Sequence, residues 1–421
     1  MMRSMFSGVT GLRNHQVKMD VIGNNIANVN TVGFKKGRAT FQDALSQTMR
    51  GASSPQGNRG GTNPMQVGLG MTIATIDTIH SPTSVEATGN ITDLAVEGDG
   101  FFVLSDGKHQ YYTRAGNFQF DEEGNFVNTA NGLKVVGWQF DLTEEIQNKS
   151  PQNVGPIVIQ KGMMVPARAT DEVKFANNLN DSDVTPTETD PTKDEYYNYI
   201  IPFKVYDSKG NEHELNIGFR KSTENTWDYN IYGAPEYNIT DGTGTLVFKN
   251  DGNYDKDATG GLNQISITVS GADTITFTPD FNKVTQFARE TSIDISSRNG
   301  YPAGTLKDIT IDITGTVSGS FDNGQNRELA QVALANFNNP GGLMKSGQNL
   351  YEYSNNSGEP NVGEPGTGGR GSISPGSLEM SNVDLSEEFT QMIITQRGFQ
   401  ANSRIITASD EMLQELVNLK R

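Results

Sequence analysis

Apolar residues recur at every seventh position near the end of the chain, which is the spacing of one face of a long helix. Asp384 and Glu387 have the spacing of a capping box, so the helix is predicted to begin there. Polar residues interrupt the neighbouring row, which leaves a single narrow apolar seam. The seam consists of Leu385, Met392, Phe399, Ile406 and Leu413, together with Phe389 on the adjoining row.

The first 30 residues repeat this pattern, because Met5, Leu12, Met19 and Ile26 are also seven apart. Two seamed helices at opposite ends of one chain predict a coiled-coil pair. Ordering a backbone costs about 1–2 kcal/mol per residue, and one interrupted apolar row offsets that cost poorly. We therefore expect the pair to be weakly ordered in a lone subunit and to become firm when sister copies cover its other faces. A two-helix stalk on a monomer is the alternative.

Between the two predicted helices the hydrophobic pattern changes to the two-residue period of β-strands. From residue 73 onward, short apolar runs alternate with turn residues such as Asn131 and Gly132, which is typical of hairpins. A second set of strand-like runs occupies 196–283. By contrast, 51–70 and 357–376 are rich in glycine and polar residues, and we expect extended connectors with few contacts there.

These elements predict a mainly β fold with an α-helical coiled-coil pair made from the two termini. Because Gly-rich stretches lie on both sides of the β region, the simplest architecture is a nested, multidomain one. The predicted parts are a terminal helical coiled-coil domain (1–33 and 382–421), an extended connector (34–72 and 357–381), an inner β-domain (73–144 and 284–356) and an inserted outer β-domain (145–283).

The chain has 421 residues with 50 acidic and 33 basic side chains, which gives a net charge of −17. An acidic middle argues against nucleic-acid binding and favours a solvated outer surface, although simple solubility explains it equally well. Cysteine is absent, which excludes disulfides and thiolate sites. No run of 18 apolar residues is present, so we expect no membrane span, and we expect no cleaved signal peptide.

Candidate catalytic and metal-ligating residues are sparse. Residues 251–262 begin like a calcium loop, but Lys256 stands where the loop needs glycine and Leu262 where it needs glutamate. No carboxylate pair lies in an apolar context that would tune one acid and one base. The sequence therefore predicts no enzyme activity, no cofactor and no metal. Four histidines are present without the spacing of a metal site: His15, His80, His109 and His213.

Three groups of residues, in order along the chain, carry a resemblance to a known family. In these residues the chain resembles the bacterial flagellar axial proteins, the rod and hook family. The groups cover both ends and the first β region. They are 21–35 (VIGNNIANVNTVGFK), then 112–118 (YTRAGNF) with 132–138 (GLKVVGW), then 381–385 (SNVDL) with 396–402 (QRGFQAN).

Length separates the members of this family, since rod members are shorter and usually lack a large inserted domain. The insertion at 145–283, with 203–211 (FKVYDSKGN) inside it, resembles the hook members, and a distal rod member is the alternative. The resemblance implies a structural subunit that polymerises into a flexible hollow tube, transmits torque and encloses an export channel. The terminal helices would line the channel, and the β-domains would lie outside them.

The resemblance also implies partners and a location. The expected partners are sister copies of the chain, the distal rod protein, the hook cap scaffolding protein, the hook–filament junction proteins and the flagellar type III export apparatus. Neither nucleic acid nor membrane is expected as a partner. The expected location is extracellular, in the flagellar hook next to the basal body, reached without a cleaved signal peptide. Phe41 and Leu45 resemble the Phe-x-x-x-apolar motif of export substrates, with a plain amphipathic turn as the alternative.

Two other classes of protein remain as alternatives. A secreted β-rich adhesin explains the acidic middle but not the matching heptads at both ends. Deleting 385–421 separates these hypotheses, because an adhesin would still bind its ligand whereas an axial subunit would fail to polymerise. A glycan hydrolase on a β scaffold would need a carboxylate pair that the sequence does not offer.

Overall fold

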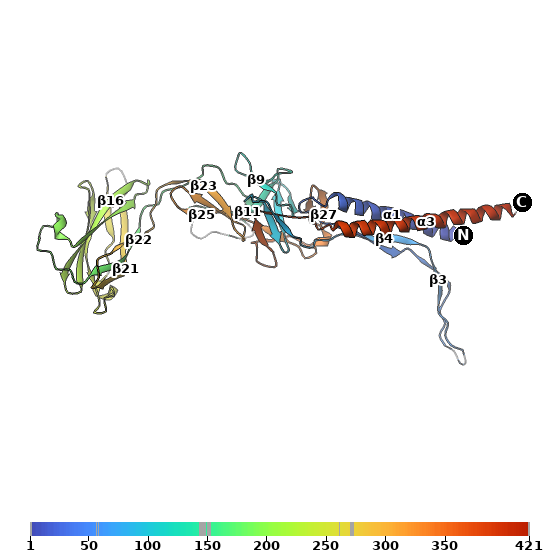
Figure 1. Ribbon diagram of the computed structural model, residues 1–421, viewed down its shortest axis with the longest axis horizontal. Helices are drawn as coiled ribbons and strands as arrows, with labels where there is room; N and C mark the ends of the chain where they lie inside the picture. The colour runs from blue at the N-terminus through green and yellow to red at the C-terminus, as the bar shows by residue number, and fades with distance from the viewer. Residues whose placement is uncertain are drawn as a thin grey trace. The chain divides into compact units, whose positions relative to one another are not determined.

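The computed structural model describes residues 2–55, 57, 59–142, 149, 153–260, 262–269 and 273–419. The chain forms two compact units, whose elements are labelled in Figure 1. The first unit comprises Met1–Gln160, Thr310–Ser318 and Glu328–Arg421, and the second comprises Lys161–Ile309 and Gly319–Arg327. The second unit therefore begins and ends later in the sequence than the inserted domain that was expected at 145–283.

α1 (Met2–Ala27) and α3 (Leu385–Asn418) lie side by side and run antiparallel, so that Gly8 near the start of α1 faces Ile406 near the end of α3. α3 begins where the sequence predicted. The side chain of Asp384 accepts a hydrogen bond from the backbone N–H of Ser386 at 2.8 Å, which satisfies one of the free donors of the first turn. The predicted pair of terminal helices is confirmed.

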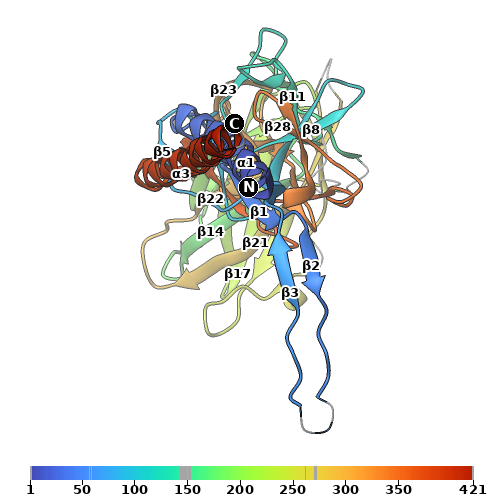
Figure 2. The same cartoon turned by 90° about the vertical axis from the view of Figure 1, so that its right-hand side faces the viewer.

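The segment after α1 forms strands instead of a connector with few contacts. β1 (Gly37–Asp43) pairs antiparallel with β4 (Met71–Thr78), and β2 (Ser46–Arg50) pairs with β3 (Met65–Gly68). Figure 2 shows the β2–β3 hairpin pointing away from the helices. Nδ2 of Asn14 in α1 donates a hydrogen bond to the carbonyl of Met71 at 2.7 Å and ties the helix to the β1–β4 ribbon. Glycine and polar residues give a weak strand signal, which is why periodicity did not reveal these pairs.

The strands of the first unit come from both sides of the second unit in the sequence. β7 (Phe101–Ser105) pairs with β8 (Gln110–Thr113), β11 (Lys134–Gln139) and β26 (Leu334–Asn336). Pairing between early and late strands confirms a nested, mainly β fold. The same sheet also includes β9 (Phe118–Phe120), β10 (Phe126–Asn128), β12 (Gly155–Pro156), β25 (Asn326–Val332), β27 (Met344–Gly347), β28 (Leu350–Glu352) and β29 (Asn361–Gly363), and continues from β25 through β24 (Thr316–Phe321) and β23 (Gly304–Ile311) to β13 (Met164–Val165).

The Gly-rich stretch before α3 belongs to the β-domain and does not form the connector expected at 357–381. β29 pairs with β26, β30 (Ser372–Pro375) pairs with β6 (Leu94–Glu97), and β31 (Ser377–Glu379) pairs with β5 (Val85–Ala87). A Cβ on Gly371 would collide with the carbonyl of Glu97, so glycine is needed here for close approach. Ser357 is fully buried. Gly-rich composition therefore marks tight packing in this segment.

The second unit is a β-sandwich whose two sheets enclose an apolar core that includes Phe219, Trp227 and Phe277. β14 is parallel to β21 and antiparallel to β22. In spatial order, one sheet contains β18 (Asn238–Thr240), β20 (Ile265–Thr268), β21 (Ile275–Phe287), β14 (Glu172–Asn180) and β22 (Asp294–Arg298), and the other contains β15 (Tyr199–Tyr206), β16 (Glu212–Thr223), β17 (Thr226–Gly233) and β19 (Thr243–Val247).

Residues 309–317 contain the end of β23 (Gly304–Ile311), a turn, and the start of β24 (Thr316–Phe321). The turn forms because the Asp312 carboxylate accepts a hydrogen bond from Thr314 N–H at 2.8 Å and Gly315 adopts a φ of 71°. Near the calcium-like sequence, Asp255 instead caps a short helix. The remaining short elements are α2 (Lys256–Thr259), η2 (Asp194–Tyr196) and η3 (Pro340–Gly342).

Candidate assembly surface

The two terminal helices meet through small side chains. At Gly11 an added Cβ would lie 2.6 Å from Nδ2 of Asn402, and at Gly398 it would lie 2.8 Å from Nε2 of His15. Distances this short mean that the two helix backbones approach closely, and a larger residue would have to displace its neighbour. Close approach is therefore encoded by glycines on both helices.

Polar side chains make much of the remaining helix contact. Nδ2 of Asn25 donates to Oε2 of the buried Glu388 at 3.2 Å, and Nζ of Lys18 donates to Oε1 of Gln391 at 3.0 Å. A polar heptad gives no hydrophobic signal, so apolar periodicity did not reveal this row. It indicated the adjacent apolar positions as the contact instead. The inward row of α3 is spaced by seven and consists of Glu388, Thr395, Asn402 and Ser409.

The structure places the predicted seam beside this polar row. Glycine and polar residues occupy the closest contact, so apolar side chains are displaced to its flanks. Three members, Leu385, Phe389 and Phe399, are exposed. The half-buried members are Met5, Leu12, Met19, Ile26, Met392, Ile406 and Leu413.

Both helices leave large apolar side chains in contact with solvent. Ile393 and Ile394 are 58% and 57% exposed, and Phe6 on α1 is 59% exposed. Such a concentration of exposed apolar side chains marks a surface that another molecule covers. The set, here called the exposed apolar set, comprises Met2, Phe6 and Val9 on α1, and Leu385, Phe389, Ile393, Ile394, Phe399, Ile405, Met412, Leu416, Val417 and Leu419 on or directly after α3.

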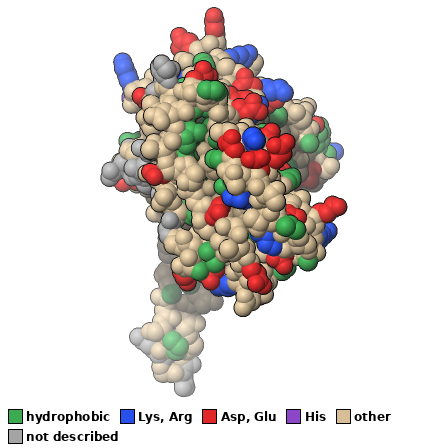
Figure 3. All heavy atoms as spheres, turned by 90° about the vertical axis from the view of Figure 1, so that its left-hand side faces the viewer, with side chains coloured by type: hydrophobic (Ala, Val, Ile, Leu, Met, Phe, Trp, Pro, Cys, Tyr) green, Lys and Arg blue, Asp and Glu red, His purple; other side chains and the backbone are tan. Residues whose placement is uncertain are grey.

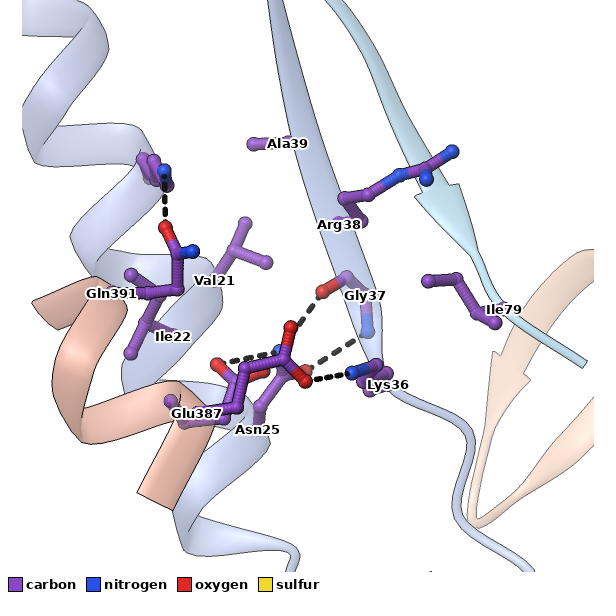
Figure 4. Close-up of a pocket in the computed structure, with 12 residues that line it drawn as sticks. Val21, Ile22, Asn25, Lys36, Gly37, Arg38, Ala39, Ile79, Glu387 and Gln391 are labelled. Carbon is purple, nitrogen blue, oxygen red and sulfur yellow. Dashed lines mark hydrogen bonds and ion pairs between the residues drawn. The ribbon is translucent and has the colours of Figure 1, made fainter. Parts of the chain in front are cut away.

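α1, α3 and β1 meet around a cavity of about 330 Å³, drawn in Figure 4. Asn25 joins the three elements. Its side-chain amide donates to the carbonyl of Gly37 and accepts from the N–H of Gly37, both at 2.9 Å, in addition to its bond with Glu388. Lys36 and Glu387 form an ion pair at 2.8 Å on the edge of the same cavity. These bonds fix the angle at which the helices leave the β1–β4 ribbon.

Three chain segments run together where the helices join the β-domain. The N–H of Gly33 donates to the carbonyl of Glu379 at 2.9 Å, and Nδ2 of Asn382 donates to the carbonyl of Ile79 at 2.7 Å. Bonds to backbone groups hold the segments in register, so the junction is stiff. We call it the neck, and it consists of 33–36, 79–84 and 379–382.

A buried ion triad links Lys35 and Glu379 of the neck to Arg114 of the β-domain. The side chains of Lys35 and Glu379 are fully buried and that of Arg114 is 1% exposed. Nζ of Lys35 pairs with Oε1 of Glu379, and Nη1 of Arg114 lies 3.3 Å from Oε2. Burial lowers the pKa of Lys35, and the Glu379 carboxylate opposes that shift. Lys35 and Arg114 belong to two of the motifs that carried the family resemblance, and this geometry gives both residues a structural role.

His80 lies close to the triad and touches two aromatic rings. Its ring centroid is 5.5 Å from that of Phe101 and 5.3 Å from that of Tyr351. Among the residues that the structure describes, neither ring nitrogen finds a hydrogen-bond partner. Burial, together with the charges of Arg114, Lys35 and Lys345, lowers the pKa of His80 to about 4. The ring is therefore neutral at neutral pH.

The two residues of the candidate export motif lie on a strand and on the loop that follows it. Phe41 is in β1, and its ring lies 6.0 Å from that of His15 on α1. Leu45 comes after β1 and is 63% exposed. Residues 41–43 belong to β1, and residues 44 and 45 lie outside any helix or strand. Its relevance to export stays a prediction.

His213, one of the four histidines considered as metal ligands, is paired with a carboxylate. Nε2 of His213 lies 3.3 Å from Oδ2 of the buried Asp207. Over the described part of the chain, no group of three or more histidine or acidic side chains could hold a metal ion. No helix of the described residues is long and apolar enough to cross a membrane.

Four family models match successive parts of the chain. Residues 5–35 match "Flagella basal body rod protein", and 95–177 match "Flagellar hook protein FlgE/F/G D1 domain". Residues 178–301 match "Flagellar basal body protein FlaE D2 domain", and 374–419 match "Flagellar basal body rod FlgEFG protein C-terminal". The first match covers α1, the last covers α3 with the strands directly before it, and the two middle matches meet within β14 of the second unit.

Full-length relatives and a solved structure agree with these matches. The flagellar hook protein FlgE of Borreliella burgdorferi is 43% identical over 444 residues, and the alignment covers 100% of both chains. The flagellar hook protein FlgE of Treponema pallidum is 39% identical over 467 residues, again with 100% of both chains covered. The crystal structure of Helicobacter pylori flagellar hook protein FlgE2 superposes with a TM-score of 0.53 and 16% identity, over 71% of this chain and 100% of that one, which shows a common fold.

Proposed function

The chain belongs to the flagellar hook protein family and is a structural subunit of the flagellar hook, and we propose that the exposed apolar set is the surface through which sister copies bind. The distal rod and adhesin alternatives are not favoured, because the full-length relatives at 43% and 39% identity are hook proteins. One observation carries the proposal. The closest contacts between the terminal helices are made largely by glycine and polar residues, and thirteen large apolar side chains on or next to the helices face solvent.

The energetics favour assembly over a free helix pair. Burying a half-exposed Ile or Phe contributes about 1 kcal/mol, since complete burial contributes about 1.5–3 kcal/mol. The helix pair of a lone subunit forgoes this contribution at every member of the exposed apolar set. Covering these side chains in a tube would offset the ordering cost of the helices. The helices would then form the inner wall around an export channel.

The neck supports a role in transmitting torque. Load that enters through the helices must cross 33–36, 79–84 and 379–382 to reach the β-domain. Backbone hydrogen bonds and the buried triad hold these segments rigidly. Pairing of β29 with β26 and of β30 with β6 ties the Gly-rich segment 357–376 to the β-domain at two places, which leaves it little freedom to act as a spring. We therefore assign bending of the tube to contacts between copies that slide and re-form.

The surface of the second unit fits such sliding contacts. On the face drawn in Figure 3, acidic side chains gather beside basic ones, and hydrophobic side chains occur as small separate patches. Polar contacts exchange with water more readily than dry apolar ones. A subunit with this surface can shift against its neighbours while the helices keep continuous contact.

Further partners and the route of export follow from the family and belong to the same proposal. The subunit would leave the cell unfolded through the flagellar type III apparatus, without cleavage, and assemble beneath the hook cap scaffolding protein. The distal rod protein would bind one end of the tube and the hook–filament junction proteins the other. Phe41 and Leu45 would be read by the export apparatus in the unfolded chain, where strand β1 does not yet exist.

Aspartates placed on the exposed apolar set test the proposal. The variant Ile393→Asp/Ile394→Asp adds two charges on α3 at positions that touch little in the free subunit. The matched control is Val184→Asp, at an 81% exposed apolar residue of the second unit. Purified full-length proteins are incubated with a precipitant, examined by negative-stain microscopy, and sedimented to measure the critical concentration for polymerisation.

Wild type and Val184→Asp are expected to form tubes at the same concentration. The double variant should raise the critical concentration at least about 100-fold, because a buried unpaired charge costs several kcal/mol. Its melting transitions as a free subunit should match those of wild type. Tubes of the double variant at the wild-type concentration would contradict the proposal.

A further inference from the structure

The first unit is completed by strands from the end of the chain. β30 pairs with β6 and β31 pairs with β5, so two early strands have no partner on these edges until 372–379 is present. The carbonyl of Glu379 also accepts the N–H of Gly33 at the start of the neck. Closure of the first unit therefore depends on contacts between residues several hundred positions apart, which form late when a chain is supplied from its N-terminus.

The charge of Glu379 adds to this dependence. Lys35 and Arg114 are both buried, and each forms its ion pair with the Glu379 carboxylate. Their other bonds go to neutral acceptors, the carbonyl of Ser81 for Lys35 and the carbonyl of Val96 for Arg114. Without Glu379, the packed neck would enclose two cations and no carboxylate from this triad. Burial of unpaired charge is strongly unfavourable, so the neck cannot close around Lys35 and Arg114 before Glu379 arrives.

The second unit has no such dependence. It consists of Lys161–Ile309 and Gly319–Arg327, so all of it precedes Glu379 in the chain. Its apolar core is drawn from residues between Val173 and Ile293. When a chain is supplied from its N-terminus, the second unit can therefore fold once residue 327 is present, whereas the first unit must wait for residue 379.

We propose that Glu379 is a closing latch, which allows the first unit and its helical assembly surface to form only after the chain has been supplied through residue 379. A subunit that emerges N-terminus first would hold a folded second unit and an open first unit until nearly all of it has emerged. It would then become competent to polymerise in one late step. This consequence for export rests on the proposed function, whereas the latch itself is a property of the isolated chain.

Refolding of the full-length protein tests the latch without any polymer or export apparatus. Denatured wild type is diluted into native buffer, and amides are labelled by pulses of hydrogen exchange at successive times. In the wild type, amides of β15–β17 should gain protection first. Amides of β5–β7 should gain protection together with those of 372–379. Protection of β5–β7 clearly before 372–379 would overturn the proposal.

Glu379→Gln removes the charge and keeps the shape of the side chain. We expect the rate at which β5–β7 gain protection to fall about 100-fold or more, or protection to be lost, while β15–β17 are unaffected. The control is Asp77→Asn, which removes an exposed carboxylate from its pair with Arg38 and should leave both units unchanged. Wild-type protection of β5–β7 in Glu379→Gln would overturn the latch.

A double variant tests whether the charge of Glu379 is the cause of the effect. Lys35→Met/Glu379→Gln removes one of the two cations along with the carboxylate. If the latch acts by neutralising charge, protection of β5–β7 should recover at least about 10-fold in rate relative to Glu379→Gln alone. No recovery would mean that the carboxylate acts through its hydrogen bonds and not by neutralising charge, which contradicts the mechanism. Tube formation enters none of these measurements, so they can fail or succeed independently of the proposed function.

Discussion

The second unit and the terminal helix pair bury their side chains in opposite ways. The sandwich encloses Trp227, Phe219 and Ile217 completely, and its core comes from one stretch of sequence. The helices contact each other through glycine, amide and carboxylate groups, and leave isoleucine and phenylalanine in water. The sandwich is thus a finished structure in the subunit, whereas under the proposed function the helices are one part of an interface whose other part is a sister copy.

The largest expected effect comes from a substitution in the sandwich core. Trp227→Ala should destabilise the second unit by about 3–5 kcal/mol, because it deletes a large and fully buried side chain. The melting transition of the second unit, followed by calorimetry, should move to lower temperature, and that of the first unit should not. Tubes should still form at low temperature. Loss of polymerisation while both units remain folded would show that the sandwich contributes to the assembly interface.

The stability of the first unit, unlike that of the sandwich, should depend on the protonation of His80, and a pH titration tests this difference. The folded-state pKa of His80 is about 4, below its ordinary value near 6.5, so the unfolded chain binds the extra proton between these pH values. Stability of the first unit should therefore be constant above pH 6.5 and fall, by at most about 3 kcal/mol, as pH drops towards 4.

His80→Phe should remove this dependence, since a phenyl ring suits the contacts with Phe101 and Tyr351 and does not titrate. The exposed His109→Gln is the matched control. Denaturant unfolding at several pH values gives the comparison. An unchanged slope in His80→Phe would mean that another group causes the acid sensitivity.

Two glycines test how closely the helices must approach. Gly398→Ala would bring a methyl group to 2.8 Å from His15 and should destabilise the helix pair within tubes by about 1–3 kcal/mol. Gly23→Ala meets nothing within 4 Å and should stabilise α1 by about 1 kcal/mol through helix propensity. Thermal dissociation of tubes should therefore shift in opposite directions for the two variants. A shift in the same direction would contradict the close packing of α1 on α3.

The smallest expected effect is at the helix cap. Asp384→Ala removes the acceptor for the first turn of α3 and should cost about 1 kcal/mol. The loss should appear as faster hydrogen exchange in the first turn of α3 and leave the sandwich unaffected. Equal exchange rates in variant and wild type would indicate that packing on the β1–β4 ribbon, and not the cap, defines the helix start.

The parts of the fold that local chemistry decides could be predicted from sequence. The Asp384 cap marks the start of α3, and the hydrophobic pattern indicated strands from residue 73 onward and a second set within 196–283. These features depend on residues a few positions apart. The nesting followed from matching patterns at the two ends. The family resemblance then supplied the function.

The parts decided by distant contacts could not be predicted. Gly371 looks like a linker residue, yet it is required because β30 lies against β6. Likewise, the apolar seam suggested a coiled coil, but Gly11 and Gly398 bring the helices together through a polar row and turn several seam residues outward. Glu379 carries no local signal at all, since its importance arises from Lys35 and Arg114, far away in sequence.

Hydrogen exchange of α3, measured on the free subunit and on assembled tubes of the same protein, tests most directly whether the helices are completed by sister copies. The account predicts rapid exchange along α3 in the free subunit and at least about 100-fold slower exchange in tubes, with β15–β17 equally protected in both. Equal protection of α3 in the two states would contradict it.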